Sequence, residues 1–211
     1  MGTRFGYVLD NQGGWFMLSK SNQGGFTMIE LIIGLVIVSI LIALAAPSYR
    51  GWIQNQQIRT AAESLLNGVQ LARVEAIKNN GRARFSLCGF PNSSWEVLAL
   101  PVIVPAAAPA NSLVCGAASN ALASEVRVQE RSAQEGSILA TVVVTPAGAS
   151  EVTFNGFGRV VANANNSATL TKFDITTPTG DRPLTVTVGA GGTTRMCDPS
   201  PLLPANDPRR C

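Results

Sequence analysis

A single carboxylate, Glu30, interrupts a long apolar run near the N-terminus. Residues 31–46 read LIIGLVIVSILIALAA, and with residues 26–29 ahead of them the run approaches the ~20 residues that span a bilayer. A carboxylate at the middle of a membrane costs about 2.5–3.5 kcal/mol on insertion scales, and less near an interface. A charge in this position therefore calls for a physical reason.

One such reason is local to the helix. Thr27 stands three residues before Glu30, which is the spacing of a helix capping box. A carboxylate in the first turn of a helix is also favoured by the helix dipole. This interpretation explains Glu30 without any partner from outside the helix.

The residues around Glu30 also form a recognisable motif. Residues 24–30 read GGFTMIE and lead directly into the apolar run. This pattern resembles the class III signal of type IV pilins and type II secretion pseudopilins. In that family a prepilin peptidase cuts after the glycine and methylates the new N-terminal residue. The resemblance implies that residues 1–25 are a leader ending at Gly25, and that Phe26 begins the mature chain.

The same resemblance gives Glu30 a second role, in assembly. Cleavage would leave a free amine on Phe26, protonated at neutral pH because the reference pKa of such an amine is about 8. Unpaired charges are costly in an apolar filament core, so this amine would pair with Glu30 of a neighbouring subunit and set the axial register. Residues 26–47 would form the transmembrane and filament-core helix, with Pro47 where pilins carry a helix-kinking proline.

Two other interpretations of this segment stay open. Residues 43–45 (ALA) look like a secretory cleavage site, which would release a soluble periplasmic protein beginning at Ala46, although Glu30 in the apolar region argues against it. The segment would also serve as a plain single-pass anchor. The leader is long for this signal type, and Met17 offers a second start. We therefore expect residues 1–16 to be an extension that leaves with the leader.

Beyond Pro47 the pattern changes to an amphipathic helix over residues 48–80. Its apolar residues recur at alternating spacings of four and three: Ile58, Ala62, Leu65, Val69, Ala72 and Ala76. We expect Gly81 to be the C′ residue that closes this helix. Together with the apolar segment, the pattern predicts one helix from Phe26 to about Asn80, on the order of 80 Å long.

The second half of this helix indicates which branch of the pilin-like family the sequence resembles. Residues 58–63 (IRTAAE) and 70–78 (QLARVEAIK) look like the helix of the FimT/FimU/GspH branch. The similarity covers Gly25 to about Leu87 and implies a minor subunit at or near a filament tip. The implied partners are the prepilin peptidase, other major and minor pilins or pseudopilins, and an inner-membrane assembly platform. The implied location is the bacterial inner membrane, as a single-pass protein with a periplasmic head, and then a type IV pilus or a type II secretion pseudopilus.

After the helix, the sequence predicts a β-rich head over residues 81–211. Short β-branched or alternating runs are separated by Gly, Pro and Asn clusters. The expected strands are residues 82–87, 95–100, 125–130, 138–144, 151–154, 159–161, 169–175 and 184–188. Residues 104–123, rich in Ala and Pro, are expected to form a long loop. The fold class is therefore α+β: a type IV pilin-like long helix packed on a small antiparallel sheet or sandwich.

The composition excludes several kinds of chemistry. The chain has no histidine, which removes His-based triads and His metal sites, and no nucleophile, phosphate-binding or metal motif indicates an enzyme or a cofactor. Its four cysteines lack CxxC spacing, and their even number suits structural disulfides in an oxidising periplasm. We expect the pairs Cys88–Cys115 and Cys197–Cys211, although sequence alone allows three pairings.

The segment around the last two cysteines suggests an alternative function. Some FimT-type pilins bind DNA through a G-R-x-R motif just before a cysteine. Residues 192–197 read GTTRMC, so Arg195 matches and Thr193 stands in place of the other arginine. Arg209 and Arg210 would compensate if a disulfide brought them beside Arg195. A net charge of +3 is too weak to require a nucleic-acid partner, so DNA binding is not the favoured function.

Overall fold

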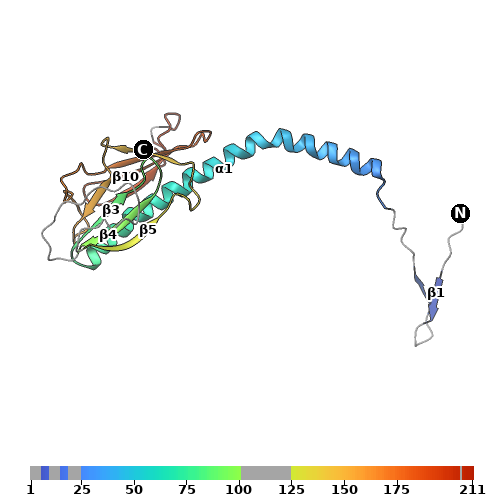
Figure 1. Cartoon of the computed structure of the whole chain (residues 1–211), viewed down its shortest axis with the longest axis horizontal. Helices are drawn as coiled ribbons and strands as arrows, with labels where there is room; N and C mark the ends of the chain where they lie inside the picture. Colours follow the sequence, from blue (N-terminus) through green and yellow to red (C-terminus); the bar gives the residue numbers. More distant parts are fainter. Residues whose placement is uncertain (1–5, 10–14, 19–24, 101–124, 205) are drawn as a thin grey trace. The chain divides into compact units, whose positions relative to one another are not determined.

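The computed structural model of the chain describes residues 6–9, 15–18, 25–100, 125–204 and 206–211. The chain divides into two compact units, Met1–Ala46 and Pro47–Cys211 (Figure 1). A helix of 51 residues, α1 (Met28–Lys78), contributes to both units. The predicted loop at residues 104–123, which includes Cys115, lies outside the described residues.

The first unit contains a hairpin and the first part of α1. Strands β1 (Gly6–Leu9) and β2 (Trp15–Leu18) pair antiparallel. Aromatic and β-branched side chains such as theirs favour strands. The sequence analysis assigned this region to a leader and did not predict the hairpin.

The C-terminal end of α1 is closed by a Schellman motif. The Asn80 N–H donates to the Ile77 carbonyl over 3.1 Å, and the Gly81 N–H donates to the Ala76 carbonyl over 3.0 Å. Asn80 has a φ of +44°, in the left-handed region that asparagine adopts more readily than most residues. The prediction that Gly81 is the C′ residue was wrong by one position. The helix ends at Lys78, Asn80 takes the left-handed turn, and Gly81 follows it.

The second unit holds two antiparallel sheets and the remainder of α1. The five-stranded sheet has the order β5 (Val126–Arg131), β4 (Trp95–Leu100), β3 (Arg82–Leu87), β7 (Glu151–Phe154) and β8 (Val160–Val161). The four-stranded sheet has the order β11 (Thr194–Cys197), β10 (Leu184–Val188), β9 (Lys172–Thr176) and β6 (Thr141–Thr145). This combination of a long helix and antiparallel sheets confirms the predicted α+β class.

Most of the predicted strands are present. Strands β3, β4, β7 and β10 have their predicted bounds, while β5, β6, β8 and β9 start or end up to three residues away. Strand β9 begins later than predicted because Thr169 forms an isolated bridge with Glu151 of the other sheet, and the Leu170 N–H donates to the Glu151 carbonyl over 2.8 Å. Strand β11 was not predicted.

The core lies between α1 and both sheets. The predicted apolar stripe of the helix is confirmed, because all six of its residues are fully buried: Ile58, Ala62, Leu65, Val69, Ala72 and Ala76. Phe85 of β3 packs edge-on against Phe173 of β9, with ring centroids 5.7 Å apart, and so joins the two sheets. Gly68 lets α1 approach closely, since a Cβ there would lie 2.7 Å from Phe85 and 2.9 Å from Trp95. Trp95 donates its indole N–H to the Ser64 hydroxyl over 2.8 Å.

Two turns from different sheets meet beside α1. Gly158 lies in the turn between β7 and β8, and Gly192, with a φ of +82°, lies in the turn between β10 and β11. A Cβ on Gly192 would collide with the Gly158 carbonyl oxygen. That carbonyl accepts a hydrogen bond of 3.2 Å from Arg73 of α1, and the Val160 N–H donates to the Ala190 carbonyl over 3.1 Å. The helix and both sheets are therefore joined at this place.

The five-stranded sheet also carries a buried cluster of charges. Arg84 and Glu151 lie on β3 and β7 at positions that alternate with core residues, and Glu125 directly precedes β5. Arg84 donates to both carboxylate oxygens of Glu125, over 2.9 and 2.8 Å, and to Glu151 over 2.6 Å. Burial raises the pKa of Glu151, while the charge of Arg84 and a hydrogen bond from Asn165 oppose the rise. Removing one member would leave a buried charge without compensation. We therefore assign this cluster to the fold.

Candidate functional site

The N-terminal candidate residues lie at the start of α1. The Glu30 N–H donates to the Thr27 hydroxyl over 3.3 Å, and the Leu31 N–H donates to the Thr27 carbonyl over 3.1 Å. Thr27 is thus the N-cap, and Glu30 is the third helical residue. The Thr27 N–H does not donate back to the Glu30 carboxylate, so only one of the two hydrogen bonds of the predicted capping box forms. Glu30 is exposed, and its carboxylate makes no hydrogen bond or ion pair with the residues that the structure describes. The cap therefore fixes the backbone at Glu30 and leaves its carboxylate available.

The helix after this cap has an uncovered apolar surface. The segment Met28–Ala45 has a mean hydropathy of 2.9, and the described residues bury none of it. Phe26, just ahead of it, is 84% exposed. The Ser39 hydroxyl donates to the Leu35 carbonyl over 2.7 Å, so this polar side chain is satisfied inside the helix. A helix of this length and composition can cross a bilayer with its polar groups paired.

Pro47 lies at the boundary between the two units. Helix α1 continues through this position as one element. Proline lacks the N–H that an interior helical residue would donate, which is the physical basis for a kink. The kink at Pro47 stays a prediction.

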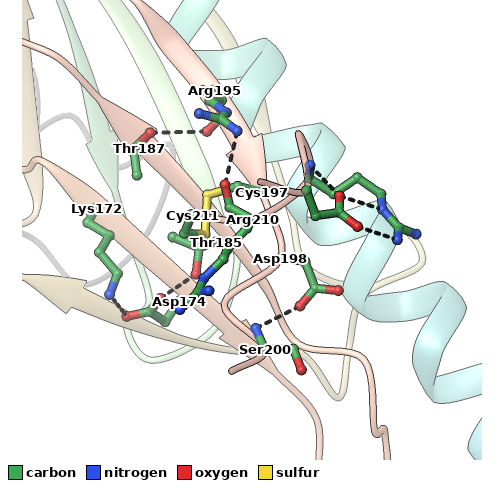
Figure 2. Close-up of a disulfide and its surroundings, with 12 residues drawn as sticks. Lys172, Asp174, Thr185, Thr187, Arg195, Cys197, Asp198, Ser200, Arg210 and Cys211 are labelled. Carbon is green, nitrogen blue, oxygen red and sulfur yellow. Dashed lines mark hydrogen bonds and ion pairs between the residues drawn. A yellow bond between two sulfur atoms is a disulfide. The ribbon is translucent and has the colours of Figure 1, made fainter. Parts of the chain in front are cut away.

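The second candidate region is the C-terminal loop. Cys197, the last residue of β11, forms a disulfide with Cys211, 14 residues further along the chain. The Asp198 N–H donates to the Arg209 carbonyl over 2.7 Å, and the Cys211 N–H donates to the Asp198 carbonyl over 3.2 Å. Figure 2 shows the disulfide beside the side chains of Arg195 and Arg210. The covalent bond and these backbone hydrogen bonds close the loop onto the edge strand of the four-stranded sheet.

The three candidate arginines come together in this loop, but each already has a partner. Arg195 donates to the Pro208 carbonyl over 2.6 Å. It also donates to the Arg210 carbonyl over 3.0 Å (Figure 2). Arg210 donates to the Leu203 carbonyl over 3.2 Å. Arg209 forms an ion pair of 2.8 Å with Asp207, and hydrogen bonds from its side chain and backbone lower the pKa of Asp207 to about 2.

The charge of the loop is nearly balanced. Residues 195–211 contain three arginines and two aspartates, so the side chains carry an excess of one positive charge. The Asp198 carboxylate also accepts the Ser200 N–H over 2.8 Å, which holds it in a local turn (Figure 2). This arrangement stabilises the loop more directly than it offers a basic surface, since phosphate binding depends on summed charge contacts.

Two family models match the sequence. The model of the type II transport protein GspH matches residues 61–192, which is more than half of the chain, and the model of the prokaryotic N-terminal methylation motif matches residues 20–46. The chain belongs to the GspH family. The expected membership of the FimT/FimU/GspH branch is thereby confirmed.

Solved structures similar to this GspH-family chain include two pilin-like proteins. The type IV minor pilin FimU of Pseudomonas aeruginosa (strain PAO1) is 16% identical, with a TM-score of 0.46, and the match covers 69% of this chain and 91% of FimU. The solution structure of GspH from E. coli is 14% identical, with a TM-score of 0.42, and the match covers 72% of this chain and 95% of GspH. No curated protein matches the chain significantly.

The remaining candidate residues of this GspH-family chain are cysteines. Cys88 takes part in a disulfide, and its predicted partner, Cys115, lies outside the described residues. Among the residues that the structure describes, no group of three His, Cys, Asp or Glu side chains is placed to hold a metal ion.

The sequence analysis missed the residues that position α1 against the GspH-family head. Gly68 and Ser64 lie on the face of the helix that meets Trp95. A glycine in the middle of a predicted helix was the available signal, because it costs up to about 1 kcal/mol relative to alanine and so indicates a close approach.

Proposed function

We propose that this GspH-family chain is a non-enzymatic minor pilin or pseudopilin. A prepilin peptidase removes residues 1–25 and methylates Phe26. The chain then crosses the bacterial inner membrane once, with residues 26–47 in the bilayer and the helix 48–80 and head 81–211 in the periplasm. An inner-membrane assembly platform transfers it, with other major and minor pilins or pseudopilins, to a type IV pilus or type II secretion pseudopilus. There it lies at or near the tip and helps to initiate assembly.

The observation that carries this proposal is the uncovered first part of α1. Segment Met28–Ala45 is strongly apolar, and no other part of the chain that the structure describes covers it. Removing apolar surface from water is worth roughly 25 cal/mol per Å², so this segment needs lipid or the helices of neighbouring subunits around it. A processing motif immediately before the segment supports a chain that uses both environments in turn.

Glu30 has a specific role in this proposal. Its backbone N–H is held by the Thr27 cap, while its carboxylate has no partner among the described residues. In a filament core, the carboxylate would pair with the methylated amine of Phe26 on a neighbouring subunit. The pairing offsets the cost of burying two charges and favours one axial register over others.

N-terminal sequencing and intact mass of the membrane-extracted protein test the processing. We expect a mature chain that begins with N-methylated Phe26. A chain that begins with Ala46 would show that the apolar segment is a secretory signal, and the proposal would then be wrong.

A matched pair of carboxylate variants tests the assembly role. Glu30→Ala should abolish or strongly reduce entry into filaments, because the Phe26 amine loses its partner. Glu63→Ala is the control, since it removes an exposed carboxylate in the second half of α1 that pairs with Arg59 over 2.8 Å. Immunogold counting on sheared filaments gives the readout. Equal incorporation of Glu30→Ala and wild type would rule out the register role.

DNA binding is the alternative function. It is favoured by the disulfide, which brings Arg195, Arg209 and Arg210 into one loop. It is disfavoured by the pairing of Arg209 with Asp207 and by the single excess charge of the loop. We expect the purified protein to give no salt-sensitive shift of duplex DNA. A shift at low salt that is lost in Arg195→Gln but kept in Arg59→Gln would establish the alternative.

A further inference from the structure

Helix α1 carries an exposed aromatic pair just after the apolar segment. Tyr49 and Trp52 are 60% and 56% exposed. Their rings stack, with centroids 5.9 Å apart and planes inclined by 25°. Residues three apart lie on the same face of a helix. The pair therefore presents one continuous aromatic surface, which the described part of the head leaves uncovered.

The position of this pair along the chain matches the surface of a bilayer. Tyr49 and Trp52 come four and seven residues after Ala45, which ends the candidate span. At 1.5 Å per helical residue, four and seven residues of helix correspond to roughly 6 and 10 Å of chain. The polar zone on each side of a bilayer is about 5–7 Å thick. Helical side chains lean toward the N-terminus, so the Trp52 ring lies closer to the span than its Cα does.

Basic residues accompany the aromatic pair. Arg50 lies between them on α1, and Arg182 lies in the loop between β9 and β10. Both are exposed, and neither has an ion-pair partner among the described residues. Hydrogen bonds hold the loop between β9 and β10 against α1, just after Trp52. The Thr179 N–H donates to Gln54 over 2.7 Å, and the Arg182 N–H donates to the Asn55 side chain over 3.3 Å.

The balance of charge here is positive. Asp181 is the acidic residue in the same loop, and its carboxylate accepts a hydrogen bond of 2.7 Å from Asn55. Two arginines against one aspartate leave an excess of one positive charge in residues 49–55 of α1 and the loop that is hydrogen-bonded to them. Aromatic rings with polar edges favour the interface between lipid and water, and basic side chains favour anionic lipid headgroups.

We propose that Tyr49, Trp52, Arg50 and Arg182 form a lipid-binding collar that seats the head on the periplasmic leaflet before assembly. This inference rests on the proposed function, because the collar needs the apolar segment to cross the bilayer. The collar fixes the depth of the segment in the membrane. It must release the lipid surface before the subunit enters a filament.

Depth-dependent fluorescence quenching tests the collar. The full chain is reconstituted in phosphatidylethanolamine–phosphatidylglycerol vesicles whose acyl chains carry bromine either near the headgroup or near the bilayer centre. The difference between wild type and Trp52→Phe isolates Trp52, since Trp15 is common to both and Trp95 is only 2% exposed inside the head. We expect the Trp52 signal to be quenched by shallow bromine and hardly affected by deep bromine.

The outcomes separate the collar from the proposed function. An unquenched Trp52 in a chain that resists alkaline extraction would leave the membrane anchor standing and overturn the collar. A chain that does not enter vesicles would overturn both. A Trp52 signal that is unquenched in vesicles and shifts to the blue only in filaments would make the pair a contact between subunits, which also overturns the collar.

A charge-variant pair tests the basic residues. Shallow quenching of Trp52 should be stronger in vesicles with phosphatidylglycerol than in vesicles of phosphatidylcholine alone. The double variant Arg50→Gln, Arg182→Gln should lose this difference. Arg59→Gln should keep it, because Arg59 lies further along α1 and pairs with Glu63. Equal quenching in both lipids for wild type would remove the arginines from the proposal.

Discussion

The two halves of α1, before and after Pro47, differ in what surrounds their apolar side chains. In the second half the apolar residues form a stripe, and both sheets bury that stripe completely. In the first half apolar residues occupy every side of the helix, and none of the residues that the structure describes covers them. A helix that is apolar all round needs an apolar environment all round. The second half is therefore completed by folding, and the first by lipid or by other subunits.

The largest expected difference between the halves comes from leucine truncation. Leu65 is fully buried in the second half, whereas Leu35 is 62% exposed in the first. Leu65→Ala should lower the free energy of unfolding of the head by about 2–5 kcal/mol, because it removes buried methyl groups and leaves a cavity. Leu35→Ala should leave it unchanged. Urea unfolding of the full chain in detergent, followed by the near-UV signal of Trp95, measures both.

Equal effects of the two leucine variants on head unfolding would break the comparison, because they would mean that the first half also packs on the head. Filament incorporation provides the converse measurement. There Leu35→Ala should be the more harmful variant in a chain whose head remains folded.

Two serines give the next comparison. Ser64 accepts the indole N–H of buried Trp95 over 2.8 Å, while Ser39 donates to the Leu35 carbonyl of its own helix over 2.7 Å. Ser64→Ala should cost about 1–3 kcal/mol of head stability, because it leaves a buried donor without its acceptor. Ser39→Ala should cost nothing, since a back-bonded serine stabilises a helix little. Thermal unfolding by circular dichroism distinguishes them, and a neutral Ser64→Ala would show that water replaces the hydroxyl.

Two glycines should give a smaller difference. A Cβ on Gly68 would lie 2.7 Å from Phe85, whereas a Cβ on Gly34 meets nothing within 4 Å. Overpacking costs about 1–3 kcal/mol, and alanine returns up to about 1 kcal/mol of helix propensity. Gly68→Ala should therefore destabilise the head by about 1 kcal/mol, and Gly34→Ala should not destabilise it. Chemical denaturation checks this pair. A stabilising Gly68→Ala would mean that the rings of Phe85 and Trp95 move aside easily.

The smallest expected effect comes from an ion pair on the surface of the head. The first half of α1 offers no such pair, because Glu30 is its single charged residue. In the head, Arg209 lowers the pKa of Asp207 from 3.8 to about 2. A lowered pKa means that the pair contributes stability above pH 3.8 and loses that contribution as the pH falls to about 2. Carboxyl ¹³C NMR should show Asp207 titrating near 2, and Arg209→Gln should return it toward 3.8. An ordinary titration in the wild type would show that the pair is open in solution.

Much of the helix and the core could be predicted from the sequence, because periodicity reports directly which residues are buried. The stripe from Ile58 to Ala76 and the bounds of β3, β4, β7 and β10 were all predicted from alternation and spacing. The helical stripe buries a regular set of side chains, whereas β3 and β7 are buried at nearly every position, so their signal lay in residue type and in the turn residues that flank them. These signals lie within each element's own sequence, so the elements could be predicted without knowing what packs against them.

The parts that were missed depend on partners far along the chain. Strand β11 (Thr194–Cys197) has no strong strand pattern and is a strand because it pairs with β10. The start of β9 is displaced because Thr169 bridges to Glu151 in the other sheet. The C′ residue of α1 was assigned to Gly81 because glycine usually takes that position, but Asn80 reaches the left-handed conformation one residue earlier.

In the candidate site, the sequence predicted which residues take part but not which hydrogen bonds and ion pairs they form. The cap at Thr27 follows from a spacing of three residues, so it could be predicted. The pairing of Arg209 with Asp207 and of Arg195 with two backbone carbonyls depends on how the loop closes at the Cys197–Cys211 disulfide. Sequence places these arginines near one another but does not show that their hydrogen bonds are already used.

The meeting of Gly158 and Gly192 beside Arg73 has a consequence for how this head can diversify. The closest contact between the turns involves main-chain atoms. Among the side chains, Asn155 shapes the first turn by accepting the N–H groups of Phe157 and Arg159, and Arg73 binds the Gly158 carbonyl. Phe157 and Thr193 lie next to these glycines, and both side chains are exposed. Substitution of Phe157 and Thr193 can therefore change the surface that a neighbouring subunit meets, while the contact between Gly158 and Gly192 keeps its geometry.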